Sequence, residues 1–180
     1  LDAVLAALVN CWSSLWTARA IGYRARNAIP HDGVALAAVV QLLVPAQASG
    51  VLFTANPLTG SRTETVIDAT WGLGEALVSG QVEPDHFVVD TGSGRITRSV
   101  GAKAVVTSPL PGGGAATSAR EPDPALSLSD AQVRELVALG RSVATEYGTP
   151  QDLEWAIADG TVYLLQARAK LRRAPQAALE

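Results

Sequence analysis

The sequence predicts an α+β fold, in which a mostly antiparallel sheet is packed with helices and ends in a β-hairpin. Two segments, at about 2–26 and 129–147, carry apolar residues at helical spacing. Between them, short runs rich in β-branched residues alternate with turn residues, as expected for strands. Finally, two alternating β-type runs flank Asp159-Gly160, which is a strong local signal for a hairpin.

Composition limits the class of protein. A chain of 180 residues is long enough for one domain with a core or for two small lobes. Its formal net charge of −3 gives no indication of nucleic acid or an anionic membrane as a partner. The single cysteine, Cys11, excludes an internal disulfide and fits a reducing cytoplasm, where we expect the protein to be. No apolar run approaches the roughly 20 residues that a membrane span needs. The chain begins at Leu1 and contains no Met, so we expect it to be a fragment of a longer protein.

The first segment, 2–26, is expected to be one helix with an apolar stripe facing the core. Trp12 and Trp16 lie on that stripe, and we interpret both as core residues. Arginines gather toward its end, where the helix dipole favours positive charge. They are Arg19, Arg24 and Arg26.

Residues 34–44 form a continuous aliphatic run that we interpret as a buried strand. Gln41 is the only side chain in the run with hydrogen-bonding atoms. A buried amide without a partner costs about 1–3 kcal/mol, so Gln41 needs either neighbouring backbone or a ligand.

Further strands are predicted at 50–56, 63–69, 86–90, 95–100 and 102–107. The glycine-rich run 71–80 is interpreted as a strand-to-helix connection that Gly80 ends, and Glu75 either caps that short helix or lines a cleft. Lys103 is interpreted as a surface residue of its strand. The Pro-, Gly-, Ser- and Ala-rich segment 108–124 is expected to be a mobile loop.

The second helical segment carries clear end signals. Ser129 and Gln132 have the spacing of a capping box, and Gly148 followed by Pro150 ends the helix. This helix leads the chain directly into the C-terminal hairpin.

Polar side chains interrupt the hairpin where a plain core hairpin would have apolar ones. Glu154 and Gln166 offer the hard oxygen ligands that suit Mg²⁺, and Arg168 can bind two phosphate oxygens at once. A two-residue loop would pair Ala158 with Thr161 and send Glu154 and Gln166 to opposite faces.

A three-residue loop, with a bulged turn, would instead pair Glu154 with Gln166 and put Arg168 and Asp152 on the same face. We expect this second register, because it is the one that allows the chemistry. On the local pattern alone, an edge hairpin with solvated polar residues remains an equal alternative.

Several motifs resemble one family. The runs Asp-Leu-Glu-Trp-Ala at 152–156, Tyr-Leu-Leu-Gln-Ala-Arg at 163–168 and Ser-Gly-Val-Leu-Phe-Thr-Ala-Asn-Pro-Leu-Thr-Gly at 49–60 resemble the ATP-binding domain of phosphoenolpyruvate synthases and pyruvate phosphate dikinases. Rifampin phosphotransferases share this domain, which has an ATP-grasp fold. The resemblance covers about residues 4–106 and 128–168. The family usually continues with Pro after the arginine, whereas this chain has Ala169.

The resemblance implies a partial ATP-grasp nucleotide-binding domain over residues 1–168, its C-terminal lobe, followed by a tail at 169–180. It implies that Gln41 meets the adenine, that Glu154 and Gln166 hold Mg²⁺ at the phosphates of ATP, and that Arg168 binds phosphate and serves catalysis. It also implies phosphohistidine and acceptor domains elsewhere in the parent protein. His86 falls where the family varies, so we interpret it as structural.

The resemblance does not choose among members of the family. The parent could be a phosphoenolpyruvate synthase-like dikinase that phosphorylates pyruvate or another acceptor, or a rifampin phosphotransferase. Alternatively, the chain could be a truncated or degenerate module without catalytic activity. We expect this chain by itself to bind Mg-ATP weakly and to turn nothing over.

Overall fold

The computed structural model describes residues 1–169, and these fall into two compact units that divide after Leu43. The first unit is Leu1–Leu43, and the second begins at Val44. The predicted tail, apart from Ala169, lies outside the described residues.

The first unit contains two helices and a short 3₁₀ turn in place of the single predicted helix. They are α1 (Asp2–Ser13), η1 (Ser14–Trp16) and α2 (Ala18–Arg26). The break falls at Thr17, whose backbone is extended and whose hydroxyl accepts a hydrogen bond from the Ala20 N–H. Threonine prefers this capping position to a helix interior, which explains why the helix restarts there.

The expectation that the two tryptophans are core residues is wrong for the described chain. Trp12 and Trp16 are 50% and 59% exposed, and α1 contains no buried residue. The first unit has only 43 residues, too few to build a second layer over the apolar stripe of α1.

Arg24 organises the end of this unit. It is only 5% exposed, and its Nη2 donates to the Leu15 carbonyl at 2.7 Å. Its Nε donates to His31 Nδ1 at 3.0 Å, and its guanidinium stacks on Trp16, 5.4 Å from the ring centre. Arg24 therefore ties the turn around His31 back to η1.

Residues 34–44 are extended but form no strand, which contradicts the predicted buried strand. Val39 is 84% and Leu42 92% exposed, and Gln41 is exposed as well. A strand needs a neighbour to accept its backbone hydrogen bonds, and no strand within residues 1–169 pairs with this run. The buried-amide argument for Gln41 therefore does not hold in this structure.

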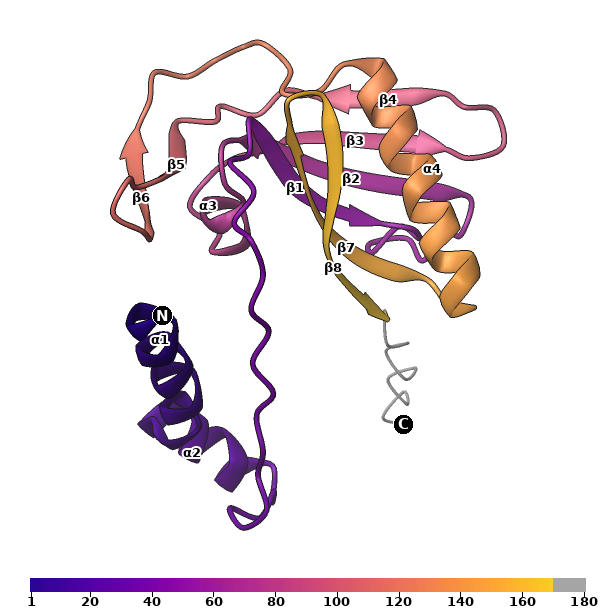
Figure 1. Ribbon diagram of the computed structural model, residues 1–180. Coiled ribbons are helices and arrows are strands. Elements are labelled where there is room, and N and C mark those ends of the chain that lie inside the picture. Colours follow the sequence, from indigo (N-terminus) through magenta and orange to yellow (C-terminus); the bar gives the residue numbers. More distant parts are fainter. Residues whose placement is uncertain (170–180) are drawn as a thin grey trace. The chain divides into compact units, whose positions relative to one another are not determined.

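The second unit is built on a six-stranded antiparallel sheet with the strand order β4-β3-β2-β1-β7-β8 (Figure 1). Its strands are β1 (Ala48–Phe53), β2 (Glu64–Trp71), β3 (Asp85–Asp90), β4 (Ile96–Ser99), β7 (Gln151–Ala158) and β8 (Thr161–Ala169). The predicted α+β class, with a mostly antiparallel sheet that ends in a hairpin, is confirmed. Because β1 pairs with both β2 and β7, the C-terminal hairpin extends the sheet that the earlier strands begin.

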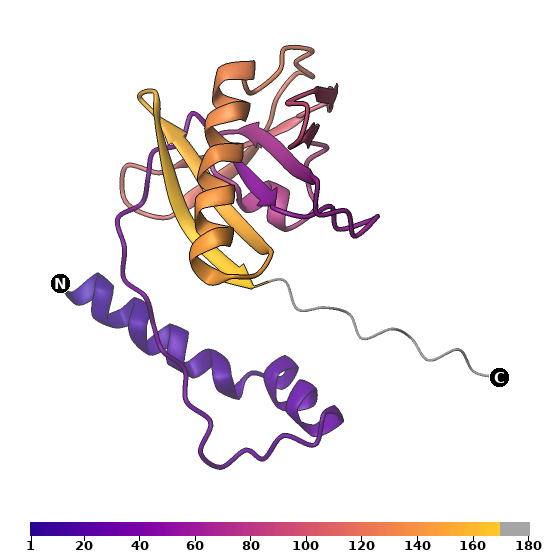
Figure 2. The same cartoon turned by 90° about the vertical axis from the view of Figure 1, so that its right-hand side faces the viewer.

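Helix α4 (Asp130–Tyr147) covers one face of this sheet, as Figures 1 and 2 show. Its predicted ends are confirmed: Ser129 and Gln132 form a reciprocal capping box, and Gly148 ends the helix with a left-handed φ of 66°. The core lies between α4 and the sheet. Its largest members include Leu52, Ile67, Phe87, Val133, Leu136, Leu153 and Trp155.

A short helix and a second small sheet lie beyond the end of β2. Helix α3 (Glu75–Val78) is followed by Gly80 with a φ of 71°, as predicted for a residue that ends a helix. Strands β5 (Val105–Pro109) and β6 (Ala115–Ala119) form a separate hairpin. β6 lies inside the segment 108–124, so that segment contains a strand that the sequence did not predict. Its expected mobility stays a prediction.

Lys103 is fully buried, which contradicts the interpretation of a surface residue. It lies before β5 with a φ of 45°, and its Nζ donates to Asp85 Oδ1 at 2.6 Å and to the Gly101 carbonyl at 2.9 Å. Asp85 Oδ2 accepts from the N–H and the hydroxyl of Ser127 at 2.6 and 2.7 Å. This cluster joins the start of β3 to the two loops on either side of the β5–β6 hairpin.

No single helix among residues 1–169 is long and apolar enough to cross a membrane. The segments Asp2–Trp16 and Ala18–Arg26, which are bent by 41° relative to each other, are together long and apolar enough for a membrane span. Core helices of soluble proteins can have the same length and composition, so the pair is weak evidence for a span.

Candidate nucleotide site

The C-terminal hairpin reaches the predicted pairing by an unpredicted route. Its turn has two residues, Asp159 and Gly160, both with left-handed φ, and Ala158 pairs with Thr161. The predicted three-residue loop is therefore wrong. Asp-Gly is the dipeptide that such a tight turn favours, because both positions need positive φ.

Glu154 nevertheless pairs with Gln166, because the register shifts farther along the strands. The irregularity lies between Glu154 and Trp155, and Trp155 pairs with Leu164. Leu165 is thus the extra residue of a bulge, which restores the alternation needed to bring Glu154 and Gln166 together. The predicted pairing is confirmed, and the bulge replaces the longer loop.

The pairing puts the polar side chains on the face of the sheet that α4 does not cover. Leu153 and Trp155 point into the core under α4, so Glu154 and Asp152 point to the opposite face. Asp152 pairs with Arg168 across the strands, as predicted. We call this side of the sheet the open face.

Three of these side chains converge on the open face. Arg168 Nη2 donates to Gln166 Oε1 at 3.1 Å and lies 3.9 Å from Glu154 Oε1. The side chains of Arg168 and Glu154 are 65% and 36% exposed. A carboxylate, an amide oxygen and a guanidinium are therefore adjacent and accessible to a ligand.

The cross-strand row that contains Glu154 continues over the sheet. Glu154 pairs with Val51, Val51 with Asp68, and Asp68 with His86. His86 Nδ1 lies 2.6 Å from Asp68 Oδ1, and the structural role expected for His86 stays a prediction. The sequence could not place Asp68 on the open face, because the insertion of β1 between β2 and β7 depends on the strand order.

The protein donors fit a magnesium ion only if a ligand completes its shell. No group of three or more His, Cys, Asp or Glu side chains within the described residues could hold a metal ion. Mg²⁺, however, is usually bound by one or two protein oxygens, with substrate phosphates and water supplying the rest. Glu154 and Gln166, adjacent on a solvent-accessible face, provide that kind of donor set.

Gln41 belongs to the first unit, whereas the hairpin belongs to the second. Its role at the adenine stays a prediction that depends on the resemblance. Glu75 lies in the first turn of α3 and makes no side-chain cap there.

An accessible carboxylate, amide and guanidinium on the open face of an antiparallel sheet make this a candidate nucleotide-binding domain. The chain belongs to the family of the pyruvate phosphate dikinase AMP/ATP-binding domain, whose model matches residues 1–179.

Proteins with two kinds of activity in their names are similar to this chain. The phosphoenolpyruvate synthase of Pyrococcus furiosus is 43% identical over 178 residues, which cover 93% of this chain and 22% of that protein. The rifampicin phosphotransferase of Streptomyces sviceus is 44% identical over 170 residues, or 92% of this chain and 19% of that protein. That of Bacillus subtilis is 42% identical over 169 residues, or 93% and 19%. The chain thus spans about a fifth of the length of these relatives.

Proposed function

We propose that this chain is the ATP- and Mg²⁺-binding part of a dikinase-type phosphotransferase. The observation that carries the proposal is the convergence of Arg168 on both Gln166 and Glu154. β8 is an edge strand, where a single solvated polar residue would need no functional explanation. Their mutual contact, on a chain of this family, favours a shared ligand.

Each side chain has a distinct task in this proposal. Glu154 and Gln166 hold the magnesium ion, which neutralises phosphate charge when it is bound. Arg168 donates to phosphate oxygens and stabilises the charge that develops as a phosphoryl group leaves, which is its catalytic role. Gln41 hydrogen-bonds the adenine. Phosphoryl transfer depends mostly on positioning and charge neutralisation, so the site needs no general base.

The rest of the reaction belongs to the longer parent protein. We propose that ATP passes phosphate to a histidine of a phosphohistidine domain, and that this domain delivers it to pyruvate or another acceptor in an acceptor domain. We also propose that the parent acts in the cytoplasm. Without those domains, the 180-residue chain is expected to bind the nucleotide but not to complete the transfer.

Titration calorimetry of the 180-residue chain with Mg-ATP tests the binding site. We expect weak binding that Glu154→Gln reduces about tenfold or more, because the loss of a charged ligand costs about 1.5–3 kcal/mol. Arg134→Gln serves as the matched control for Arg168→Gln, since Arg134 lies on α4 and the hydrogen bond that its side chain makes within residues 1–169 goes to the Asp130 carbonyl. Equal binding by Glu154→Gln, Arg168→Gln and the unmodified chain would refute the site.

Two alternatives stand beside this proposal. The names of the Streptomyces and Bacillus relatives favour rifampicin as the acceptor, and an assay of the full-length parent with pyruvate and with rifampicin distinguishes the two. If neither the chain nor the parent binds Mg-ATP, the non-catalytic alternative holds instead.

A further inference from the structure

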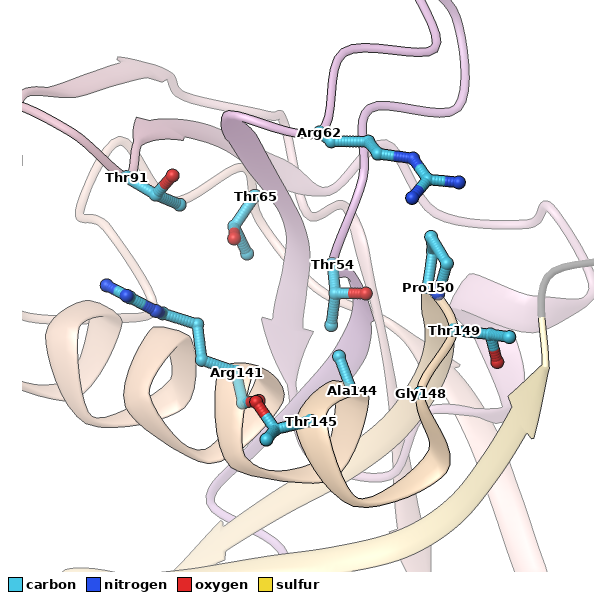
Figure 3. Close-up of a pocket in the computed structure, with 10 residues that line it drawn as sticks. All are labelled: Thr54, Arg62, Thr65, Thr91, Arg141, Ala144, Thr145, Gly148, Thr149 and Pro150. Atoms are coloured by element: carbon cyan, nitrogen blue, oxygen red, sulfur yellow. The ribbon is translucent and has the colours of Figure 1, made fainter.

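A pocket of about 380 Å³ lies on the face of the sheet opposite the candidate nucleotide site (Figure 3). Its walls come from the end of α4, the segment after β1 and the start of β2. Thr65 lies two residues before Ile67 on β2, so its side chain is on the same face of the sheet as Ile67, which is in the core under α4. Asp68 lies in the same cross-strand row as Glu154, on the opposite face. The pocket is therefore separated from Glu154, Gln166 and Arg168 by the sheet itself.

The charged side chains that line the pocket are both positive. They are Arg62 and Arg141, and no acidic residue among those described lines it. Neither guanidinium forms an ion pair or a side-chain hydrogen bond within residues 1–169. Figure 3 shows the two guanidiniums at opposite ends of the pocket, with Thr65 and Thr54 between them.

Thr65 gives a second, independent indication of a ligand. The residue is only 1% exposed, yet its hydroxyl makes no hydrogen bond within the part of the chain that the structure describes. In Figure 3 this hydroxyl points into the pocket, toward the side of Arg141. This hydroxyl is not among the fully enclosed unpaired atoms of the described residues, so the pocket gives an acceptor access to it.

We propose that this pocket binds a polyphosphate group, as a site separate from the one on the open face. Guanidiniums at both ends require an anion that is elongated, and the hydroxyl between them requires acceptor oxygens in the middle of the ligand. A linear polyphosphate carries oxygens along its whole length, whereas a dicarboxylate of similar size has a carbon chain there. Arginine binds phosphate oxygens in pairs, which suits each end of the pocket.

The test uses the 180-residue chain, inorganic tripolyphosphate as the probe, and a chelator to exclude divalent cations. Nuclear magnetic resonance should show amide shifts at Thr65 and Gly148. Arg62→Gln and Arg141→Gln should each raise the Kd about tenfold, the effect expected when one charge-assisted contact is lost. Both arginines are exposed, and an unchanged circular dichroism spectrum verifies the fold of each variant.

Arg134→Gln is the matched control, because Arg134 is a cation of α4 that does not line the pocket. It should change the Kd less than about twofold, since a distant exposed charge is largely screened. Equal weakening by all three variants would mean general electrostatic attraction and would overturn the proposal, as would shifts confined to β7 and β8. Glu154→Gln should leave tripolyphosphate binding intact, so this site and the nucleotide site can fail separately.

Discussion

Two of the clusters in which a cation meets a carboxylate in the second unit differ in nearly every physical respect. Lys103 and Asp85 are both fully buried and 2.6 Å apart. Arg168 and Glu154 are 65% and 36% exposed and 3.9 Å apart. In the buried cluster, Asp85 also accepts hydrogen bonds from Gly101 and Ser127.

The difference indicates what each cluster is for. The oxygens of Asp85 are occupied by the chain itself, so the buried cluster has no capacity left for a ligand and acts as a cross-link between loops. Glu154 lies 3.9 Å from the Arg168 guanidinium, too far for a hydrogen bond, and its side chain is 36% exposed to solvent. A loosely paired, accessible carboxylate can exchange its partner for a metal ion or a phosphate-bound cation, whereas a fully bonded buried one cannot.

The largest effect is predicted for a substitution that disrupts the buried cluster. Lys103→Met leaves the Asp85 carboxylate buried without its cation, and removal of one partner of a buried pair costs about 3–5 kcal/mol. We expect the free energy of unfolding, measured by urea denaturation of the chain, to fall by that amount. A loss below about 1 kcal/mol would show that water or a rearrangement compensates the charge, and the cluster would not be the cross-link described above.

The double variant Lys103→Met with Asp85→Asn tests whether the loss of stability comes from an unpaired buried charge. An asparagine can still accept from Ser127 through its carbonyl oxygen, and no charge is left buried. We therefore expect the double variant to be more stable than Lys103→Met alone by at least about 1 kcal/mol. Equal stability of the two variants in the same denaturation experiment would contradict the assignment of the loss to an unpaired charge.

The exposed cluster should respond in the opposite way. Arg168→Gln removes a solvated cation, so the free energy of unfolding should change by less than about 1 kcal/mol. The same variant should lose Mg-ATP binding in calorimetry. A variant that loses both stability and binding would instead make Arg168 a structural residue, like Lys103.

Local signals in the sequence were sufficient for the elements that depend on near neighbours. The capping box at Ser129 and the Asp159-Gly160 turn each involve residues a few positions apart, and both are present. The burial of Lys103 depends on Asp85, 18 residues away, and on Ser127 beyond the β5–β6 hairpin. No local pattern distinguishes such a lysine from a surface one.

The sequence was sufficient to predict that Glu154 pairs with Gln166, but not how the two strands reach that pairing. The prediction was made by asking which register brings these two side chains together. Alternation alone cannot decide between a longer turn and a bulge, because both shift the register by one residue. For the apolar run 34–44 the prediction failed for a different reason. Its residue types favour a strand, but the described residues offer it no partner strand.

The smallest predicted effect concerns a third carboxylate, Asp90, at the turn between β3 and β4. The Ser93 hydroxyl, which donates to Asp90 Oδ1 at 2.6 Å, lowers the pKa of Asp90, and the Ser93 N–H lowers it further. Since the pKa of Asp90 in the folded state lies below its ordinary value, Asp90 stabilises the fold at pH values above that ordinary pKa. This stabilisation is lost as the pH falls through the folded-state pKa.

Ser93→Ala removes the hydroxyl but keeps the N–H, so the pKa of Asp90 should rise only part of the way to its ordinary value. Titration of the Asp90 carboxyl carbon by nuclear magnetic resonance measures this directly. By linkage, the stabilisation that Asp90 contributes above its ordinary pKa, neutral pH included, should then be smaller than in the unmodified chain, and as the pH falls it should be lost completely at a slightly higher pH. If the pKa of Asp90 stays the same in Ser93→Ala, the hydroxyl does not lower it. The hydroxyl of this exposed turn would then have no measurable effect on its carboxylate.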